Sequence, residues 1–362
     1  MSNNKTLDEL FLKETLRLAK QGQGWANPNP MVGAVIVKNG KVIGKGYHHK
    51  AGLPHAEIEA LQNSKTSVKG ATMYVSLEPH AYHGKTPPCT DAIIQAGIAR
   101  VVCATLDPNP KVRGKGLKKL QSAGIKTAVG MLKQEARRLN EAFFTFHEKR
   151  RPFIVLKFAA SLDGKIATRL HDSKWISNPE ARQAARNLRS IYQSVLVGVN
   201  TVIRDNPHLG ARRSGKPDPL RIILDTSLRI PMGSRVLRDT NALIVTAKAT
   251  PQAKRKALES QGVSVVVLPS KKISLKKLMH ELYRRKIISV LVEGGGAVLG
   301  SFVDEQLADK VYAVHAPILI GGEQAVSVRG LGVRAVRDAI HLKDVSYKRF
   351  GDNMMTVGYA QV

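Results

Sequence analysis

The feature that most constrains the fold is a regular alternation of short apolar runs with segments of helical periodicity. Runs such as 101–106 and 287–292 are typical of buried strands, and amphipathic segments separate them. Because a helix must bury its apolar stripe against another element, this alternation predicts layered α/β architecture. A polar stretch that ends at Pro152 interrupts the pattern, so we expect two domains, 1–150 and 151–362.

The expected elements follow from periodicity and from turn residues. Asn39-Gly40 is a strong signal for a hairpin between two of the strands. Helices are expected at 7–21, 55–63, 89–96, 117–123 and 179–190, and strands at 32–37, 41–47, 73–77, 101–106, 153–158, 194–199, 221–224, 242–245, 263–268 and 287–292.

Composition limits the class of protein. With 362 residues, 43% of them hydrophobic, the chain can fill two cores. No stretch approaches the roughly 18 apolar residues of a membrane span, and the polar N-terminus lacks the core of a signal peptide. We therefore expect a cytoplasmic protein that does not interact with membranes. Two cysteines, Cys89 and Cys103, exclude a disulfide framework and favour a metal or catalytic role for one of them.

The chain is strongly basic, with a formal net charge of +29. Residues 1–150 hold 23 Lys and Arg against 11 Asp and Glu, and residues 151–362 hold 34 against 17. This even distribution favours a generally basic surface, suited to phosphorylated small substrates, over a dedicated nucleic-acid groove. The sequence does not indicate what the excess charge is for.

One set of residues indicates zinc chemistry. His55-Ala56-Glu57 opens a predicted helix, and Cys89 follows a proline at the start of another. In zinc deaminases a histidine and two cysteines hold the metal, and a glutamate that is not a ligand transfers protons. Singly, His55 as a helix cap and Cys89 as a small buried residue would be the simpler interpretation. Their combination in the correct order favours a metal site, whereas Cys103 lies in an apolar run and is expected to pack in the core.

Three segments of this half resemble a known family. NPNPMVG at 27–33, AGLPHAE at 51–57 and LEPHAYHGKTPPC at 77–89 are similar to the deaminase half of the bifunctional deaminase/reductase of riboflavin biosynthesis. The long gap between the two downstream metal positions is specific to that family, because other zinc deaminases use a compact Pro-Cys-x-x-Cys. The resemblance implies a cytidine-deaminase-like three-layer domain. It also implies metal ligands His55, His80 and Cys89, the catalytic Glu57, and substrate contacts from Asn27, His49 and Lys85.

His80 departs from the family, which has cysteine at this position. Imidazole is an acceptable zinc ligand, with a Zn–N distance of about 2.0–2.1 Å against about 2.3 Å for sulfur. The exchange of thiolate for neutral imidazole makes the site about one unit more positive, which should acidify bound water and weaken metal affinity. Three outcomes stay open: a working site with two histidines and one cysteine, a weak site, or an inactive domain that keeps its shape. His83 is a second candidate ligand.

The second half continues the resemblance. FIVLKFAASLDGK at 153–165, VEGGG at 292–296 and PILIGG at 317–322 are similar to the family's reductase half, a dihydrofolate-reductase-like α/β domain. A glycine run after a strand lets backbone amides approach phosphates, although this run does not fit G-x-G-x-x-G. By matched position, NADPH contacts are implied for Ala159, Trp175, Thr201, Asp205, Thr226, Gly294, Gly295, Gly296, Ala297, Val298 and Leu299. Substrate contacts are implied for Lys157, Ser173, Arg189, Leu209, Arg212 and Glu293.

The resemblance implies a function with two steps. The first domain would remove the 2-amino group of a 2,5-diamino-6-ribosylamino-pyrimidinone 5′-phosphate, and the second would reduce the ribosyl group to ribityl with NADPH. A reductase with an impaired deaminase-like domain is the alternative. A nucleic-acid-binding or base-editing protein is a further hypothesis, which the second domain and the long ligand gap disfavour. Relatives tend to self-associate, so the sequence leaves a homo-oligomer open.

Overall fold

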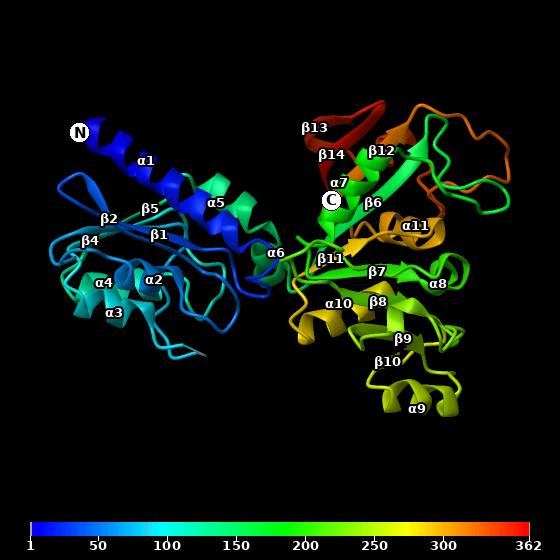
Figure 1. Cartoon of the computed structure of the whole chain (residues 1–362), viewed down its shortest axis with the longest axis horizontal. Coiled ribbons are helices and arrows are strands. Elements are labelled where there is room, and N and C mark those ends of the chain that lie inside the picture. The colour runs from blue at the N-terminus through cyan, green and yellow to red at the C-terminus, as the bar shows by residue number, and fades with distance from the viewer. Residues whose placement is uncertain (1, 85, 362) are drawn as a thin grey trace. The chain divides into compact units, whose positions relative to one another are not determined.

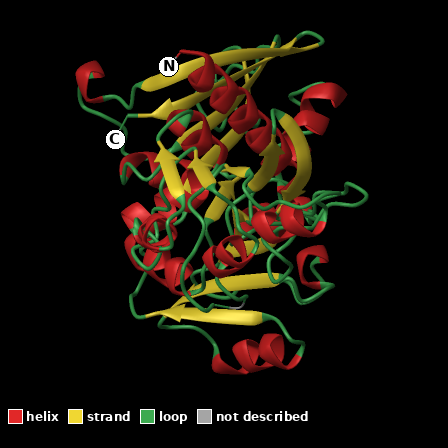
Figure 2. Ribbon diagram, turned by 90° about the vertical axis from the view of Figure 1, so that its left-hand side faces the viewer, coloured by secondary structure: helices red, strands yellow, loops and turns green. Residues whose placement is uncertain are grey.

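The computed structural model describes residues 2–84 and 86–361, and these form two compact units, 1–150 and 151–362. Each unit contains a sheet of its own, of five and nine strands respectively (Figure 1). In both units helices accompany the strands, coloured red and yellow in Figure 2. Among the described residues, no helix is at once long enough and apolar enough to cross a bilayer.

The first unit is a mixed sheet with helices on both faces. Its elements are α1 (Ser2–Ala19), η1 (Lys20–Gly22), β1 (Gly33–Lys38), β2 (Lys41–Tyr47), α2 (Ala56–Gln62), β3 (Thr72–Val75), α3 (Cys89–Gln95), β4 (Arg100–Cys103), α4 (Lys115–Ser122), β5 (Lys126–Val129), α5 (Lys133–Leu139) and α6 (Glu141–Lys149). The strand order is β2-β1-β3-β4-β5. The predicted hairpin at Asn39-Gly40 is confirmed, since both residues have positive φ and Lys38 pairs with Lys41.

Alternating residues of this sheet enter two cores, which explains the nearly continuous apolar runs. Ile36, Met73 and Val101 pack with α2, α3 and α4 on one face. Val35 and Val102 pack with α1 and α5 on the other. The predicted three-layer architecture is confirmed, and α2 and α3 therefore begin on the same face of the sheet.

The second unit is built on a sheet that is mostly parallel. Its elements are β6 (Phe153–Ser161), α7 (Pro179–Leu188), β7 (Ser194–Gly198), α8 (Val199–Asp205), β8 (Leu220–Leu224), η2 (Arg235–Leu237), β9 (Ala242–Ala247), α9 (Gln252–Ser260), β10 (Ser264–Leu268), α10 (Leu275–Arg284), β11 (Ser289–Val292), α11 (Gly296–Asp304), β12 (Lys310–Ala316), η3 (Val336–Asp338), β13 (Leu342–Phe350) and β14 (Asn353–Ala360). The strand order is β10-β9-β8-β7-β11-β6-β12-β14-β13.

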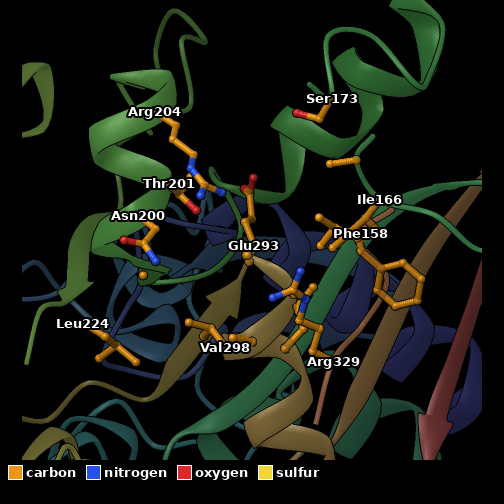
Figure 3. Close-up of a pocket in the computed structure, with 18 of the residues that line it drawn as sticks. Phe158, Ile166, Ser173, Asn200, Thr201, Arg204, Leu224, Glu293, Val298 and Arg329 are labelled. Carbon is orange, nitrogen blue, oxygen red and sulfur yellow. The ribbon is translucent and has the colours of Figure 1, made fainter. Parts of the chain in front are cut away.

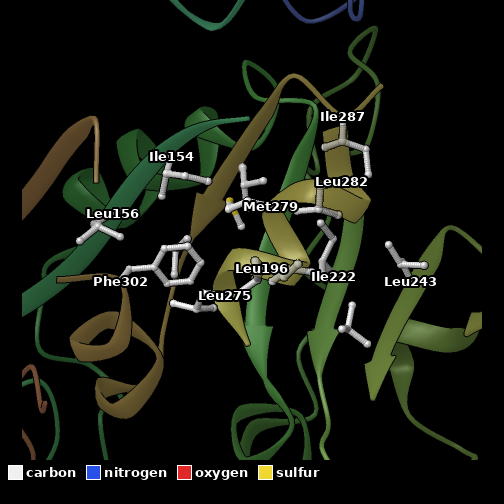
Figure 4. Packing of buried hydrophobic residues seen from close by; sticks show 14 of the residues in the cluster. Ile154, Leu156, Leu196, Ile222, Leu243, Leu275, Met279, Leu282, Ile287 and Phe302 are labelled. Atoms are coloured by element: carbon white, nitrogen blue, oxygen red, sulfur yellow. The ribbon is translucent and has the colours of Figure 1, made fainter. Parts of the chain in front are cut away.

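The strands from β10 to β12 in this order run parallel to one another. Strand β14 is antiparallel to β12, and β13 pairs antiparallel with β14 at the edge of the sheet. One face packs against α10 and α11, where Leu196, Ile222 and Leu243 meet Met279 and Phe302 (Figure 4). The other face forms a separate core with Leu258 of α9. Because parallel strands end on one edge, β6, β7, β8 and β11 bring their carboxyl ends together there, which is where α/β sheets bind ligands.

Candidate functional site

Three segments of the first unit bring the predicted metal ligands together. His55 immediately precedes α2, Cys89 is the first residue of α3, and His80 lies in the segment after β3. One nitrogen of each imidazole and the sulfur of Cys89 all lie within 4.8 Å of one another. Residues separated by up to 34 positions thus converge where two helices begin.

The donor atoms fit a zinc ion. Cys89 Sγ lies 3.4 Å from His55 Nδ1, close to the separation of about 3.6 Å that tetrahedral geometry with ordinary Zn–N and Zn–S bonds requires. The ring centroids of His55 and His80 are 4.7 Å apart. Two imidazoles and a thiolate leave a fourth position open, as catalytic zinc sites do.

Burial keeps the imidazoles of His55 and His80 in the neutral form that binds a metal. Burial, with a smaller contribution from His48, lowers the pKa of His55 to about 4. Burial and the neighbouring His55 also lower the pKa of His80. Both rings are therefore neutral at pH 7, the form in which imidazole binds a metal. Burial and the Glu57 carboxylate raise the pKa of the Cys89 thiol, so metal binding must displace its proton.

Glu57 is placed to carry protons at this site. It lies in the first turn of α2, is only 3% exposed, and shares a hydrogen bond with Cys89. Burial raises its pKa above the usual range for a carboxylic acid. A carboxyl group in this position, beside the metal ligands, can accept a proton and return it.

The structure identifies His48 as a neighbour of the ligands that the sequence analysis missed. His48 is 2% exposed, and its ring centroid lies 5.1 Å from that of His55. Its Nε2 lies 3.1 Å from Asn29 Nδ2, and its Nδ1 lies 3.0 Å from the carbonyl oxygen of Pro54. The predicted substrate residue His49 is instead 44% exposed and lies 3.7 Å from Glu59.

Asn27 and Lys85 are the two other substrate residues predicted for this unit. Asn27 Nδ2 donates to the carbonyl oxygen of Gly24 at 3.4 Å, in the loop that also carries Asn29. Lys85 lies outside the described residues. Within the part of the chain that the structure describes, His83 is exposed and is not part of the ligand cluster.

The buried carboxylate of Glu78 fixes the segment that carries His80 through hydrogen bonds to the backbone. Glu78 accepts hydrogen bonds from the backbone N–H groups of Asp107, Gly114, Gly116 and Leu117. A Cβ at Gly116 would lie 1.9 Å from the carbonyl oxygen of Pro79, so only glycine permits this close approach. Burial, and to a lesser extent Glu78, raise the pKa of Asp107 to about 7. Asp107 was not predicted as a site residue, although it opens the turn Asp107-Pro108-Asn109-Pro110, which is visible in the sequence.

The second unit contains a cavity of about 1040 Å³ at the carboxyl edge of its sheet (Figure 3). Every predicted cofactor residue lines it: Ala159, Trp175, Thr201, Asp205, Thr226, Gly294, Gly295, Gly296, Ala297, Val298 and Leu299. The glycine run joins β11 to α11, and a Cβ at Gly296 would lie 2.3 Å from the carbonyl oxygen of Ser327. The cavity is large enough for a dinucleotide, and the backbone amides at the start of α11 suit its phosphates.

Glu293, which lines this cavity, forms a buried ion pair with Arg189. Arg189 Nε and Nη2 donate to the Glu293 carboxylate at 2.7 and 2.8 Å. Burial opposes ionisation of Glu293, but Arg189 and Lys157 lower its pKa to about 2. Burial, with a contribution from Arg189, lowers the pKa of Lys157, and Glu293 counteracts this. Arg189 is therefore held by Glu293 and is not a solvated residue of a helix face.

The remaining predicted substrate residues differ in position. Lys157, Ser173 and Glu293 line the cavity. Leu209 is 3% exposed in the core, so it offers a ligand little beyond its backbone, and Arg212 is exposed. Neither is among the described residues that line the cavity.

Comparisons with known proteins agree with this division. The family model described as "Cytidine and deoxycytidylate deaminase zinc-binding region" matches residues 5–105, and that described as "RibD C-terminal domain" matches residues 152–356. Riboflavin biosynthesis protein RibD of Aquifex aeolicus is 44% identical over 97% of this chain and 98% of its own length. The Escherichia coli protein of the same name is 36% identical over 96% and 98%.

Solved structures show the same similarity. Acinetobacter baumannii RibD superposes with a TM-score of 0.91 at 33% identity, covering 99% of this chain and all of that one. The Thermotoga maritima diaminohydroxyphosphoribosylaminopyrimidine deaminase/5-amino-6-(5-phosphoribosylamino)uracil reductase superposes with a TM-score of 0.85 at 36% identity, with the same coverage.

Proposed function

Because this chain belongs to the RibD family of riboflavin biosynthesis proteins, we propose that it deaminates a phosphorylated diaminopyrimidine in one unit and reduces its ribosyl group in the other. Members of the family combine a zinc-binding deaminase domain with an NADPH-dependent reductase domain, and this chain is a bifunctional enzyme of that kind. The observation that carries the deaminase half is the convergence of His55, His80 and Cys89 within 4.8 Å, beside the buried Glu57.

In the deaminase half, His55, His80 and Cys89 would hold zinc. When bound, zinc supplies Lewis acidity and makes hydroxide available at neutral pH. Glu57 takes up the proton that water loses and delivers a proton to the leaving ammonia, as its burial and position allow. We assign the recognition of the pyrimidine to His48 and Asn29, which form a fixed polar pair next to His55.

In the reductase half, the cavity residues hold the cofactor and the sugar. NADPH, when bound, supplies the hydride. Lys157 and Arg189 both face the Glu293 carboxylate, so the three side chains form a rigid polar group that can orient the hydroxyl groups of the ribose. The general basic charge of the chain, +29, favours approach of a phosphorylated substrate.

Mass analysis of the products tests this function directly. The purified chain receives zinc and the diaminopyrimidine phosphate, with and without NADPH. We expect the deaminated compound without NADPH and the deaminated, reduced compound with it. If only a supplied deaminated compound is reduced, the first unit is an inactive domain with the family's fold, and the exchange at His80 becomes the leading explanation.

His80→Ala should lower the affinity for zinc by about 100-fold or more, because each ligand contributes a large share of the binding free energy. His80→Cys should keep or increase the affinity, since it restores a thiolate. Competition with a chromogenic chelator measures both constants without reference to catalysis. His83→Ala is the matched control, since His83 is an exposed histidine three positions away. Zinc affinity that is unchanged in His80→Ala would show that His80 is not a ligand.

A further inference from the structure

The cavity of the second unit has two ends that are lined by different elements. Lys157 and Phe158, from the middle of β6, and Glu293, directly after β11, line one end. At the other end, the lining comes from the loop after β8 and from the segment that precedes α10. In Figure 3, Leu224 and Asn200 lie on one side of Glu293, and Phe158 and Ile166 lie on the other. The strand order β8-β7-β11-β6 agrees with this arrangement, because β8 and β6 lie on opposite sides of β11.

The end beside β8 and α10 offers apolar surface and positive charge. Leu224, Ile273 and Val298 are half-buried side chains that line the cavity and pack on the core beneath it. Arg229 and Lys272 line the same end. A planar base can lie against the apolar residues, with an anion beside the two cations.

Arg229 is held in place before any ligand arrives. Its Nη2 donates to Asn200 Oδ1 at 2.7 Å, which leaves further N–H groups of the guanidinium available. The loop that carries it is fixed by Asp225, a fully buried carboxylate that accepts from the backbone N–H groups of Arg229 and Ile230 at 2.9 and 2.7 Å. The hydroxyl-bearing residues Thr226 and Ser227 lie in the same loop and also line the cavity.

The carboxylates that line the cavity lie elsewhere. Among the described residues they are Asp205, Glu293 and Glu305, which belong to the end of α8, the end of β11 and the residue after α11. An acidic side chain that accepts from a ribose 2′-hydroxyl is the usual device for binding NADH, whereas a cation accommodates the 2′-phosphate of NADPH. The end beside β8 and α10 therefore has the composition that NADPH requires.

We propose that Arg229 and Lys272 select NADPH over NADH by binding the phosphate on the 2′ position of its adenosine ribose. The nicotinamide must reach the substrate group at Lys157 and Glu293, so the adenosine half extends to the opposite end, where these two cations lie. This inference rests on the reductase half of the proposed function, and it adds the residues that determine the choice of cofactor.

Calorimetric titration of the full chain tests the proposal with ligands that differ only in the phosphate. Adenosine 2′,5′-bisphosphate is compared with AMP, and NADPH with NADH. In the double variant Arg229→Met, Lys272→Met, we expect affinity for the bisphosphate and for NADPH to fall by about 10- to 100-fold, the effect of losing charge-assisted hydrogen bonds. Affinity for AMP and NADH should stay within about twofold. Retained AMP binding also shows that the cavity is intact.

Lys271→Met is the matched control, because Lys271 is an exposed neighbour that is not among the described residues lining the cavity. It should leave all four affinities unchanged. The inference is overturned if the double variant binds NADPH as the unmodified chain does, or if it loses AMP and the bisphosphate equally. An unmodified chain that binds neither dinucleotide would overturn the inference together with the reductase assignment itself.

Discussion

Glu57→Gln should reduce deamination by about 10³-fold or more while leaving reduction of a supplied deaminated compound within about twofold. Glutamine keeps the shape of the side chain but cannot accept the proton from water or deliver one to ammonia. The carboxyl is buried beside Cys89, so solvent water cannot easily replace it in this role. Product mass analysis without NADPH measures the first activity, and oxidation of NADPH with the deaminated compound measures the second.

Glu59→Gln is the control for this variant. Glu59 lies on the same helix two residues later, but its carboxylate faces His49 on the outside. It should retain full deamination. Zinc content must be equal in both variants, so that a loss of metal is not mistaken for a loss of proton transfer. Normal deamination by Glu57→Gln, or a parallel fall of both activities in a folded protein, would contradict the assignment of Glu57.

Most of the fold could be predicted because the central strands of both sheets are buried on two faces. Such strands are nearly continuous apolar runs, so 194–199 and 287–292 were recognisable and differ by one or two residues from β7 and β11. The hairpin β13–β14 gave no such signal. Leu342–Phe350 is an edge strand whose residues are mostly exposed, so no apolar period marks it.

Site residues could be predicted where they belong to short motifs of neighbouring residues. His55, Glu57 and Cys89 belong to short motifs with fixed spacing, and the structure brings the two ligands together with His80. The choice between His48 and His49 depended on which of two adjacent residues after β2 lies beside His55, and the structure places His48 there. Successive residues of an extended chain point to opposite sides, and the sequence does not say which side holds the site.

The pairing of Arg189 with Glu293 was beyond sequence reasoning. The two residues are 104 positions apart, and Arg189 follows an amphipathic helix on which arginine is ordinarily exposed. Glu293 is buried only because β11 ends beneath the cavity. Long-range pairing of buried charges follows from strand order, which local periodicity does not contain.

Glu293→Gln should lower the free energy of unfolding of residues 151–362 by about 3 kcal/mol at pH 7. The carboxylate is 9% exposed and is the partner of Arg189. Removing its charge leaves the buried Arg189 guanidinium and Lys157 ammonium without compensation. Urea unfolding of the full chain, with hydrogen exchange of peptides from β6 and β11, assigns the loss to this unit. Glu259→Gln, at an exposed ion pair with Arg255 on α9, should change stability by less than about 0.5 kcal/mol.

The pH dependence gives the sharper test. Arg189 and Lys157 lower the pKa of Glu293 to about 2 against the opposing effect of burial, and the usual value is 4.5. A group whose pKa is lower in the folded state contributes stability above its unfolded pKa and loses it as the pH falls toward the folded value. The unmodified chain should therefore lose about 2 kcal/mol from this residue between pH 6 and pH 3, and Glu293→Gln should not. The difference in free energy of unfolding between the unmodified chain and Glu293→Gln should narrow from about 3 to about 1 kcal/mol over that range. A difference in free energy that stays constant with pH would mean that the Glu293 carboxylate contributes through shape and hydrogen bonding, and that its charge does not stabilise the buried Arg189.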